Sequence, residues 1–436
     1  MRAEPLSKLH VLLYGLNFEP ELTGIGKYSG EMAHWLVAQG HTVQVVTAPP
    51  YYPEWSVRPG FSAMAYRAGD ARPGLSVLRC PLWVPSKVTG LSRVLHLMTF
   101  ALSSGPALLW AGLRSRPSVL MVVVPTLACV PVALFVARLL RVPAWLHVQD
   151  FEVDAMHSMG IVQGSGRAHR MVVAAESWLM RRFDRVSSIS RNMVRRLHAK
   201  GLPPERTIEF PNWVDVSTIR PQGSPADNSN PVRAKFAVPP GAKVVLYAGN
   251  MGQKQGIEVV VDAARLLQDR QDIFFVLVGA GSAVTGLQRH AQGLENIRWL
   301  PLQPIELLND LLNAADIHVL PQRADAADLV MPSKLTGMLA SGRPVVGTAD
   351  ANTQLGMTLD ACGVRVPPEN ATKLADAVDR LSRDEAQLKR LGVMGREHAM
   401  NHLSHTAILS AFEAELKRLV RATDCLLPDT EKTCEK

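Results

Sequence analysis

A glycine-rich turn with one lysine is the part of the sequence best suited to holding an anion. It lies in V-V-L-Y-A-G-N-M-G-Q-K-Q-G-I-E-V-V-V-D-A-A-R-L-L (244–267), between a β-branched run and an amphipathic helical pattern. The glycines allow close backbone approach, and Lys254 supplies a positive charge. A helix N-terminus beside an ammonium favours a phosphate or diphosphate. The alternative is a tight strand-to-helix connection that binds nothing.

A second turn of the same kind opens the chain. The run H-V-L-L-Y-G (10–15) leads through P-E-L-T-G-I-G-K (20–27), with Gly24, Gly26 and Lys27, into a helical pattern that ends near Gly40. Two such openings more than two hundred residues apart predict two similar lobes, with the functional site in the cleft between them.

Polar residues gather where another strand is predicted to end. In H-V-Q-D-F-E-V-D (147–154), Asp150 follows the strand and His147 lies within it. The carboxyl ends of strands in an open α/β sheet border the ligand crevice, so both residues are candidates for catalysis. Strand side chains alternate between faces, which places His147 and Gln149 on the same face. The alternatives are a helix-capping aspartate and a buried, hydrogen-bonded histidine.

Ser333 and Lys334 begin a helical pattern after the run I-H-V-L-P (317–321). A serine and a lysine at a helix N-terminus suit the anionic end of a ligand or a ribose hydroxyl. Plain capping by Ser333 is the alternative.

The charge balance also favours an anionic partner, because the formal net charge is +8. The most basic stretch is 181–200, and Phe183 is its only aromatic residue. Nucleic-acid binding would want more aromatic residues among the charges, so no nucleic-acid partner is expected. A solvated helix face or a basic patch that faces a membrane explains this stretch better.

Alternating strand-like and helical runs must position these groups. A hydrophobic content of 47% in 436 residues supports two cores, and the alternation predicts α/β domains with mostly parallel sheets. We predict an N-terminal domain (1–212), a C-terminal domain (213–400), a helix that returns to the first domain (401–422) and a disordered tail (423–436). The expected strands are 9–15, 42–47, 75–79, 118–124, 143–149, 185–189, 243–248, 273–278, 296–299, 316–320, 344–348 and 363–366.

Two stretches without Asp, Glu, Lys or Arg, residues 94–113 and 117–137, raise the question of a membrane. The second is better explained as a buried strand followed by a helix at 127–140. The first is a covered core helix or a helix on the membrane surface, flanked by Lys87, Arg93, Arg114 and Arg116; a transmembrane hairpin is a further alternative. Five scattered cysteines and an N-terminus without a signal-peptide pattern predict a cytoplasmic protein.

These pieces together resemble the family 4 retaining glycosyltransferases of GT-B fold, especially the branch of colanic acid and related exopolysaccharide synthesis. The resemblance rests on the order and spacing of motifs along nearly the whole chain. They are Y-G-L-N-F-E-P-E-L-T-G-I-G-K-Y-S-G-E-M, T-A-P-P-Y-Y-P, L-H-V-Q-D-F-E-V-D-A-M, S-S-I-S-R-N-M, F-P-N-W-V-D, Y-A-G-N-M-G-Q-K-Q-G, V-G-A-G, A-A-D-I-H-V-L-P and M-P-S-K-L-T-G-M-L-A-S-G-R-P-V-V.

The resemblance implies two Rossmann-like lobes with parallel sheets facing a central cleft, and a C-terminal helix that crosses back to the first lobe. It also implies a nucleotide-sugar donor on the second lobe, an acceptor on the first, and no cofactor or bound metal. The residues expected near the donor phosphates are Gly24, Gly26, Gly252, Lys254, Ser333 and Lys334, and those near the base and ribose are Gly279 and Gly281.

The sequence departs from the family pattern at two places. Many relatives carry two glutamates eight positions apart, where this chain has Asp328 or Leu329 and then Gly337. In the phosphate turn, Asn250 stands where an arginine is usual and Lys254 comes one position early. Since the second glutamate holds the ribose in those relatives, ribose recognition is expected to differ here, and Asp328 is a candidate donor-binding residue.

We expect a cytoplasmic enzyme, peripheral on the anionic inner face of the plasma membrane, that moves a sugar to a polyprenyl-diphosphate-linked glycan. GDP-fucose is the expected donor, from the colanic acid likeness alone. Two alternatives are a nucleotide-sugar epimerase of GT-B fold and a catalytically degenerate glycosyltransferase that acts as a binding partner.

Overall fold

The computed structural model describes residues 8–21, 24–69, 72–86, 89–124, 127–151, 167–223, 230–252, 255–324 and 332–424. The chain divides into two compact α/β units. Unit 1 comprises Met1–Phe210 and Leu409–Lys436, and unit 2 comprises Pro211–Ile408. The predicted tail, 423–436, falls outside the described residues from residue 425 onward.

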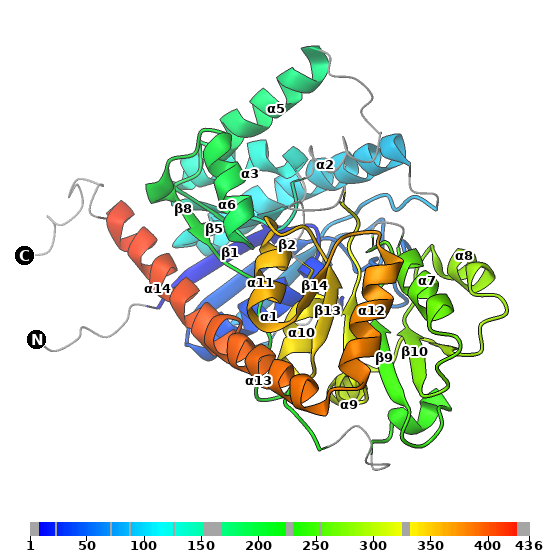
Figure 1. The fold of residues 1–436 in the computed structure, drawn as a ribbon. Helices are drawn as coiled ribbons and strands as arrows, with labels where there is room; N and C mark the ends of the chain where they lie inside the picture. The colour runs from blue at the N-terminus through cyan, green and yellow to red at the C-terminus, as the bar shows by residue number, and fades with distance from the viewer. Residues whose placement is uncertain are drawn as a thin grey trace, which may run out of the picture. The chain divides into compact units, whose positions relative to one another are not determined.

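Unit 1 contains an eight-stranded sheet in the order β3-β4-β2-β1-β5-β6-β7-β8 (Figure 1). All neighbouring strands are parallel except β3 and β4. The strands are β1 (His10–Gly15), β2 (Thr42–Thr47), β3 (Arg67–Ala68), β4 (Leu75–Arg79), β5 (Val119–Val124), β6 (Ala144–Val148), β7 (Arg185–Ser188) and β8 (Thr207–Glu209).

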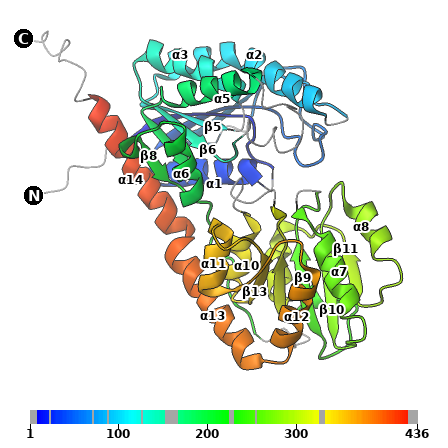
Figure 2. The same cartoon turned by 45° about the horizontal axis from the view of Figure 1, so that its top comes forward.

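Helices cover both faces of this sheet. In Figure 2, α2 and α3 lie over one face and α1 over the other. The six residues of β5 are all buried, as expected for a strand covered on both sides. Because residues 119–124 form this strand, the transmembrane-hairpin alternative is wrong. The helices are α1 (Gly24–Ala38), α2 (Gly90–Ser115), α3 (Val130–Leu140), α5 (Arg167–Met180), α6 (Arg191–Ala199) and two short 3-10 turns, η1 (Leu127–Cys129) and η2 (Pro204–Arg206).

The last helix, α14 (His405–Asp424), packs against unit 1 through its buried face. Phe412 stacks on Phe210 with ring centroids 4.5 Å apart and meets the edge of Trp145 at 5.1 Å. Glu413 lies 3.1 Å from His41 Nε2, which ties the helix to the loop before β2. The preceding helix, α13, ends at His402, so the returning helix begins four residues later than the predicted 401.

Unit 2 contains a fully parallel six-stranded sheet in the order β11-β10-β9-β12-β13-β14. Its strands are β9 (Lys243–Ala248), β10 (Ile273–Val278), β11 (Ile297–Leu300), β12 (Ile317–Leu320), β13 (Val345–Thr348) and β14 (Val364–Val366). Its helices are η3 (Arg233–Phe236), α7 (Glu258–Leu266), α8 (Val284–His290), η5 (Ile305–Leu307), α9 (Leu308–Asn313), α10 (Lys334–Ala340), α11 (Gln354–Cys362), α12 (Ala371–Ser382) and α13 (Glu385–His402).

All predicted strands are present, with ends that differ by no more than one residue. The prediction of two α/β domains with mostly parallel sheets is confirmed. The sequence patterns missed β3 and β8. Both are too short, at two and three residues, to show an apolar alternation.

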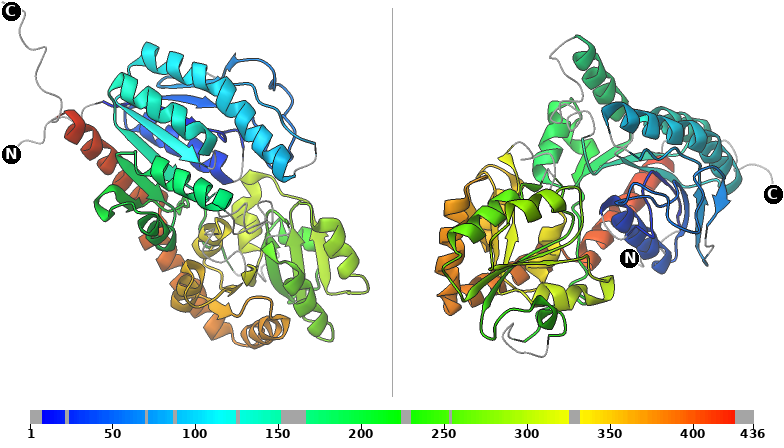
Figure 3. Two further views of the ribbon diagram at one scale, coloured as in Figure 1. Left: turned by 90° about the horizontal axis from the view of Figure 1, so that it is seen from above. Right: turned by 90° about the vertical axis from the view of Figure 1, so that its right-hand side faces the viewer.

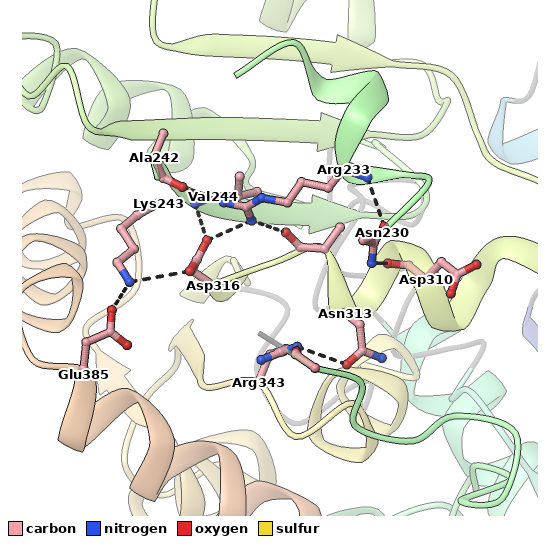
Figure 4. A network of polar contacts seen from close by, with 12 residues as sticks. Asn230, Arg233, Ala242, Lys243, Val244, Asp310, Asn313, Asp316, Arg343 and Glu385 are labelled. Carbon is pink, nitrogen blue, oxygen red and sulfur yellow. Dashed lines mark hydrogen bonds and ion pairs between the residues drawn. The ribbon is translucent and has the colours of Figure 1, made fainter. Parts of the chain in front are cut away.

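A buried ionic network holds the start of the unit 2 sheet (Figure 4). Asp316 accepts hydrogen bonds from Val244 N at 2.9 Å and Arg233 Nη1 at 3.0 Å, and Lys243 Nζ lies 3.6 Å away. Arg233 also donates to the carbonyls of Ala314 and Ala242. Asp316 is 8% exposed and Arg233 9%, so each charge depends on its partner rather than on water.

Replacing Asp316 with alanine is expected to destabilise unit 2 by about 3–5 kcal/mol, because it leaves the buried Arg233 guanidinium without its counter-charge. Urea unfolding followed by tryptophan fluorescence measures this loss. The matched control is Asp262→Ala, which removes the exposed ion pair with His290 and is expected to cost less than about 1 kcal/mol. Equal losses for the two variants would contradict the role given to the network.

Candidate functional site

The strand order shows where a ligand would bind in each unit. In unit 2 the order reverses between β9 and β12, and in unit 1 between β1 and β5. Open α/β sheets bind ligands outside the carboxyl ends of the strands at this reversal. The segments that follow β9 and β12 carry Gly249 to Gly252 and Ser333 to Lys334, so the topology places both predicted phosphate segments at the same edge.

The turns after β9 and β10 pack backbone against backbone. Gly249 N donates to Val278 O at 2.9 Å, and Met251 N donates to Ala280 O at 2.8 Å. A Cβ at Gly279 would lie 1.9 Å from Gly249 O, and a Cβ at Gly281 would lie 2.4 Å from Met251 O. The two residues have φ of +152° and +154°. Only glycine therefore fits at 279 and 281.

Lys334 lies directly over the turn after β9. Its Nζ donates to Tyr247 OH at 2.5 Å and to Asn250 O at 3.1 Å, and it lies 4.5 Å from the centroid of the Tyr247 ring. A Cβ at Gly249, which has φ of +133°, would lie 2.4 Å from Lys334 Cε. Burial lowers the pKa of Lys334 to about 8. An anion at this edge would restore the stability of the charged ammonium.

Ser333 occupies the N-cap position of α10, but its side chain makes no capping hydrogen bond. The plain-capping alternative for Ser333 is therefore wrong.

Asn250 is exposed, and its Oδ1 would lie 2.8 Å from a Cβ at Gly281. Gly252 O accepts a hydrogen bond from Gln255 N at 3.2 Å.

Two of the predicted site residues, Lys254 and Asp328, lie outside the described residues. Gly337 is described: it lies within α10, and a Cβ there would be 3.3 Å from Leu312 Cδ1. A side chain at position 337 would therefore require a small shift of the Leu312 side chain.

In unit 1, a buried carboxylate supports the first glycine turn. Glu21 is 3% exposed, and it accepts hydrogen bonds from Tyr51 N at 3.2 Å, Tyr52 N at 3.1 Å and Asn17 Nδ2 at 3.0 Å. Burial raises its pKa. A Cβ at Gly26 would lie 2.6 Å from Glu21 Oε2, so the start of α1 sits directly on this carboxylate.

Gly24 begins α1 with φ of +64°, a backbone conformation that side chains rarely adopt. A Cβ there would lie 3.9 Å from Tyr52 Cε1. The opening turn and the loop after β2 therefore meet at Gly24 as well as at Glu21.

His147 is buried within β6, and both of its ring nitrogens are engaged. Nδ1 lies 2.9 Å from Ser187 Oγ, and Nε2 lies 3.0 Å from Gln149 Nε2, which confirms that His147 and Gln149 share a face. Burial lowers the pKa of His147 to about 3, so the ring is neutral at neutral pH. To exchange a proton with a ligand it would have to give up one of these hydrogen bonds.

Asp150 follows β6 and is partly exposed. Its charge contributes, after burial, to the raised pKa of Tyr52, so the two side chains are close enough to interact. The structure therefore brings Asp150 toward the loop after β2, at the carboxyl edge of the unit 1 sheet.

Sequence reasoning missed Tyr247 and Glu21. Tyr247 appears only as a residue of an apolar strand, although its hydroxyl lies at the strand end where ligands bind. The role of Glu21 had no local signal, because the backbone amides that it binds belong to Tyr51 and Tyr52, 30 and 31 positions away.

At the unit 2 edge, the Lys334 ammonium lies beside the glycine turn after β9, an arrangement that favours an anion. Among the residues that the structure describes, no group of three or more His, Cys, Asp or Glu side chains could hold a metal ion.

Comparisons with known proteins identify glycosyltransferases as the relatives of this chain. Residues 23–213 match the family model for a glycosyl transferase 4-like domain, and residues 242–384 match that for glycosyl transferases group 1. The chain is 40% identical over 416 residues to the putative colanic acid biosynthesis glycosyl transferase WcaI of Escherichia coli (strain K12), covering 94% of this chain and 100% of that protein.

Solved structures show the same fold at low identity. Sucrose-phosphate synthase from Thermosynechococcus elongatus aligns with a TM-score of 0.72 and 18% identity, over 95% of this chain and 100% of that one. Alr3699/HepE from Anabaena, solved in complex with UDP-glucose, aligns with a TM-score of 0.67 and 15% identity, over 94% and 100% of the two chains.

Gly279→Ala is expected to destabilise unit 2 by about 1–3 kcal/mol or more, because its Cβ would overlap the Gly249 carbonyl. Thermal and urea unfolding measure the effect. Gly286→Ala is the control: it lies in α8 with no heavy atom within 4 Å of the new Cβ, and it should leave stability unchanged or raise it by up to about 1 kcal/mol. A stable Gly279→Ala protein would contradict the close packing of the two turns.

Proposed function

Since the chain belongs to the family 4 glycosyltransferases of GT-B fold, we propose that it moves a sugar from a nucleotide diphosphate donor to a polyprenyl-diphosphate-linked glycan. Transfer with retained configuration follows from the family likeness. The 40% identity to a colanic acid biosynthesis protein over that protein's whole length supports a role in exopolysaccharide synthesis. GDP-fucose is the donor proposed, from this likeness alone.

The observation that carries the proposal is the placement of Lys334 over the turn after β9. Its ammonium is desolvated and bonded to neutral oxygens of Tyr247 and Asn250. A donor diphosphate at this edge supplies the anion that such an ammonium favours. Gly252, Gly279 and Gly281, with Lys254, Asn250, Ser333 and Asp328, complete the proposed donor site.

The proposed reaction breaks the bond between the anomeric carbon and the leaving diphosphate and forms a bond to an acceptor hydroxyl oxygen. Attack comes from the face that the diphosphate leaves, and the diphosphate oxygen takes the hydroxyl proton. Lys334 and Lys254 stabilise the negative charge that develops on the diphosphate. Asp150 and His147 are the unit 1 residues proposed to act near the acceptor. Gly24 and Gly26 are proposed near the donor phosphates.

The proposed acceptor also sets the proposed location. A polyprenyl-diphosphate carrier stays in a bilayer, so the enzyme must reach its substrate at a membrane surface. We propose the cytoplasmic face of the plasma membrane, with peripheral contact to anionic lipid.

The donor is tested by thermal unfolding of the full chain with UDP, GDP, ADP and dTDP. A nucleotide that binds only the folded protein, at a hundred times its Kd, stabilises it by about 2.7 kcal/mol. GDP is expected to raise the unfolding temperature most. The matching assay follows transfer from GDP-fucose to lipid extracts, with Lys334→Met expected to lose most of the turnover. Wild-type turnover in that variant would favour a site elsewhere, and sugar-nucleotide turnover without lipid would favour an epimerase.

Donor binding is also expected to weaken at alkaline pH. The pKa of Lys334 is lowered to about 8, so its ammonium is present below this pH and is lost as the pH rises through it. Nucleotide diphosphate affinity is expected to be about tenfold weaker at pH 9 than at pH 7. Titration calorimetry at the two values measures this, with Lys334→Met as the variant that should bind weakly and without this dependence. An unchanged pH dependence in Lys334→Met would contradict the assignment.

A further inference from the structure

A row of exposed apolar side chains runs the length of α2 in unit 1. Leu91 is 72% exposed and Leu102 71% exposed, although both residues belong to the class that folding normally buries. The exposed apolar residues of α2 and the neighbouring α3 are Leu91, Val94, Leu95, Met98, Leu102, Trp110, Leu113, Phe135 and Leu139.

These residues form one surface. Leu91, Leu95, Met98 and Leu102 are spaced by three or four positions, and so are Trp110 and Leu113, which puts them on one side of the helix. Figures 2 and 3 show α2 and α3 side by side. A Cβ at Gly112 of α2 would lie 2.6 Å from Leu140 Cδ1 of α3, so the two helices touch. We call this surface the α2–α3 face.

The opposite side of α2 is fixed to the sheet. Ser104 Oγ lies 2.7 Å from Tyr14 OH of β1, and the Phe100 ring is 6.0 Å from the Tyr14 ring. Among the described helices, α2 is long and apolar enough to cross a membrane. Crossing would, however, expose the buried side, including Phe100 and Leu108, and leave the sheet uncovered. The helix is therefore suited to lie along a surface.

The segment that forms this face carries only positive charges. From residue 71 to residue 149 the sequence has no aspartate or glutamate. Arg114 lies over the Trp110 ring at 5.7 Å, which keeps its guanidinium beside the apolar row. The other basic residues near the ends of α2 and α3 are Arg93, Arg116, Arg138 and Arg141.

We infer that the α2–α3 face docks on an anionic lipid bilayer, with α2 parallel to the membrane plane. A bilayer offers phosphates to the arginines and an acyl region to the leucines. A second copy of the chain fits less well, because arginines would face arginines with no carboxylate from this segment between them. The inference deepens the proposed function, since it rests on an acceptor held in the membrane, and it identifies the surface that brings the enzyme there.

Vesicle co-flotation of the full chain tests whether the apolar residues of the α2–α3 face contribute to membrane binding. Wild type is expected to float with phosphatidylcholine–phosphatidylglycerol vesicles. Met98→Glu with Leu102→Glu is expected to reduce binding by about tenfold or more. The native side chains are 43% and 71% exposed, respectively, and glutamates in their place would not enter the acyl region. The control is Leu302→Glu in unit 2, an equally apolar residue that is 51% exposed, which should bind as wild type does.

The variants Arg114→Glu and Arg138→Glu test whether the arginines of this face contribute to the binding of anionic lipid. Each is expected to weaken binding to the anionic vesicles by about fivefold or more, with little effect on vesicles of phosphatidylcholine alone. Arg390→Glu, an exposed arginine on α13, is the control.

Equal flotation of wild type and the α2–α3 variants would overturn the inference, and so would equal binding to neutral and anionic vesicles. Sedimentation that shows a dimer abolished by Met98→Glu with Leu102→Glu, without a change in flotation, would assign the face to a second copy instead. The nucleotide-induced rise in unfolding temperature is measured on the same variants. If it persists while flotation is lost, the two proposals stand separately; if it is absent in wild type, the proposed function fails by itself.

Discussion

The close approach of two backbone turns is the constraint on which the candidate donor site depends. The carbonyl of Gly249 occupies the space where residue 279 would carry a Cβ, and the carbonyl of Met251 does the same for residue 281. The aliphatic stem of Lys334 likewise occupies the space where residue 249 would carry a Cβ. The described part of this edge therefore brings backbone turns and one ammonium together, which is the arrangement on which the proposed diphosphate site rests.

Unit 2 contains a buried cation, Arg233, and a partly buried one, Lys334. Arg233 is paired with Asp316, which also accepts a hydrogen bond from Val244 N and so joins the start of β9 to the start of β12. Lys334 donates instead to a hydroxyl and a carbonyl, and burial lowers its pKa. The ion pair of Arg233 stabilises the fold, whereas we propose that the ammonium of Lys334 binds an anionic ligand.

Unit 1 gives the same helix two tasks. One side of α2 covers the sheet through Phe100, Ser104 and Leu108, while the other side leaves a row of leucines in solvent. The segment of 79 residues that contains α2 has no carboxylate, so this helix and its neighbours in the segment carry only positive charges. The buried Glu21 is the opposite case, an acid placed inside so that its oxygens hold backbone amides of the loop after β2.

The sequence alone determined the described strands except the short β3 and β8, their mostly parallel arrangement, the glycine turns and the family. These features are local: apolar runs such as 119–124 and turns such as 249–252 are recognisable within a few residues. Tertiary structure decided which residues meet. Lys334 and Tyr247 are 87 positions apart, and Glu21 and Tyr51 are 30 apart. His147 is hydrogen-bonded to Ser187, 40 positions away. Periodicity reports the face on which a side chain lies, but a hydrogen bond across such distances depends on how the chain closes, which no short pattern encodes.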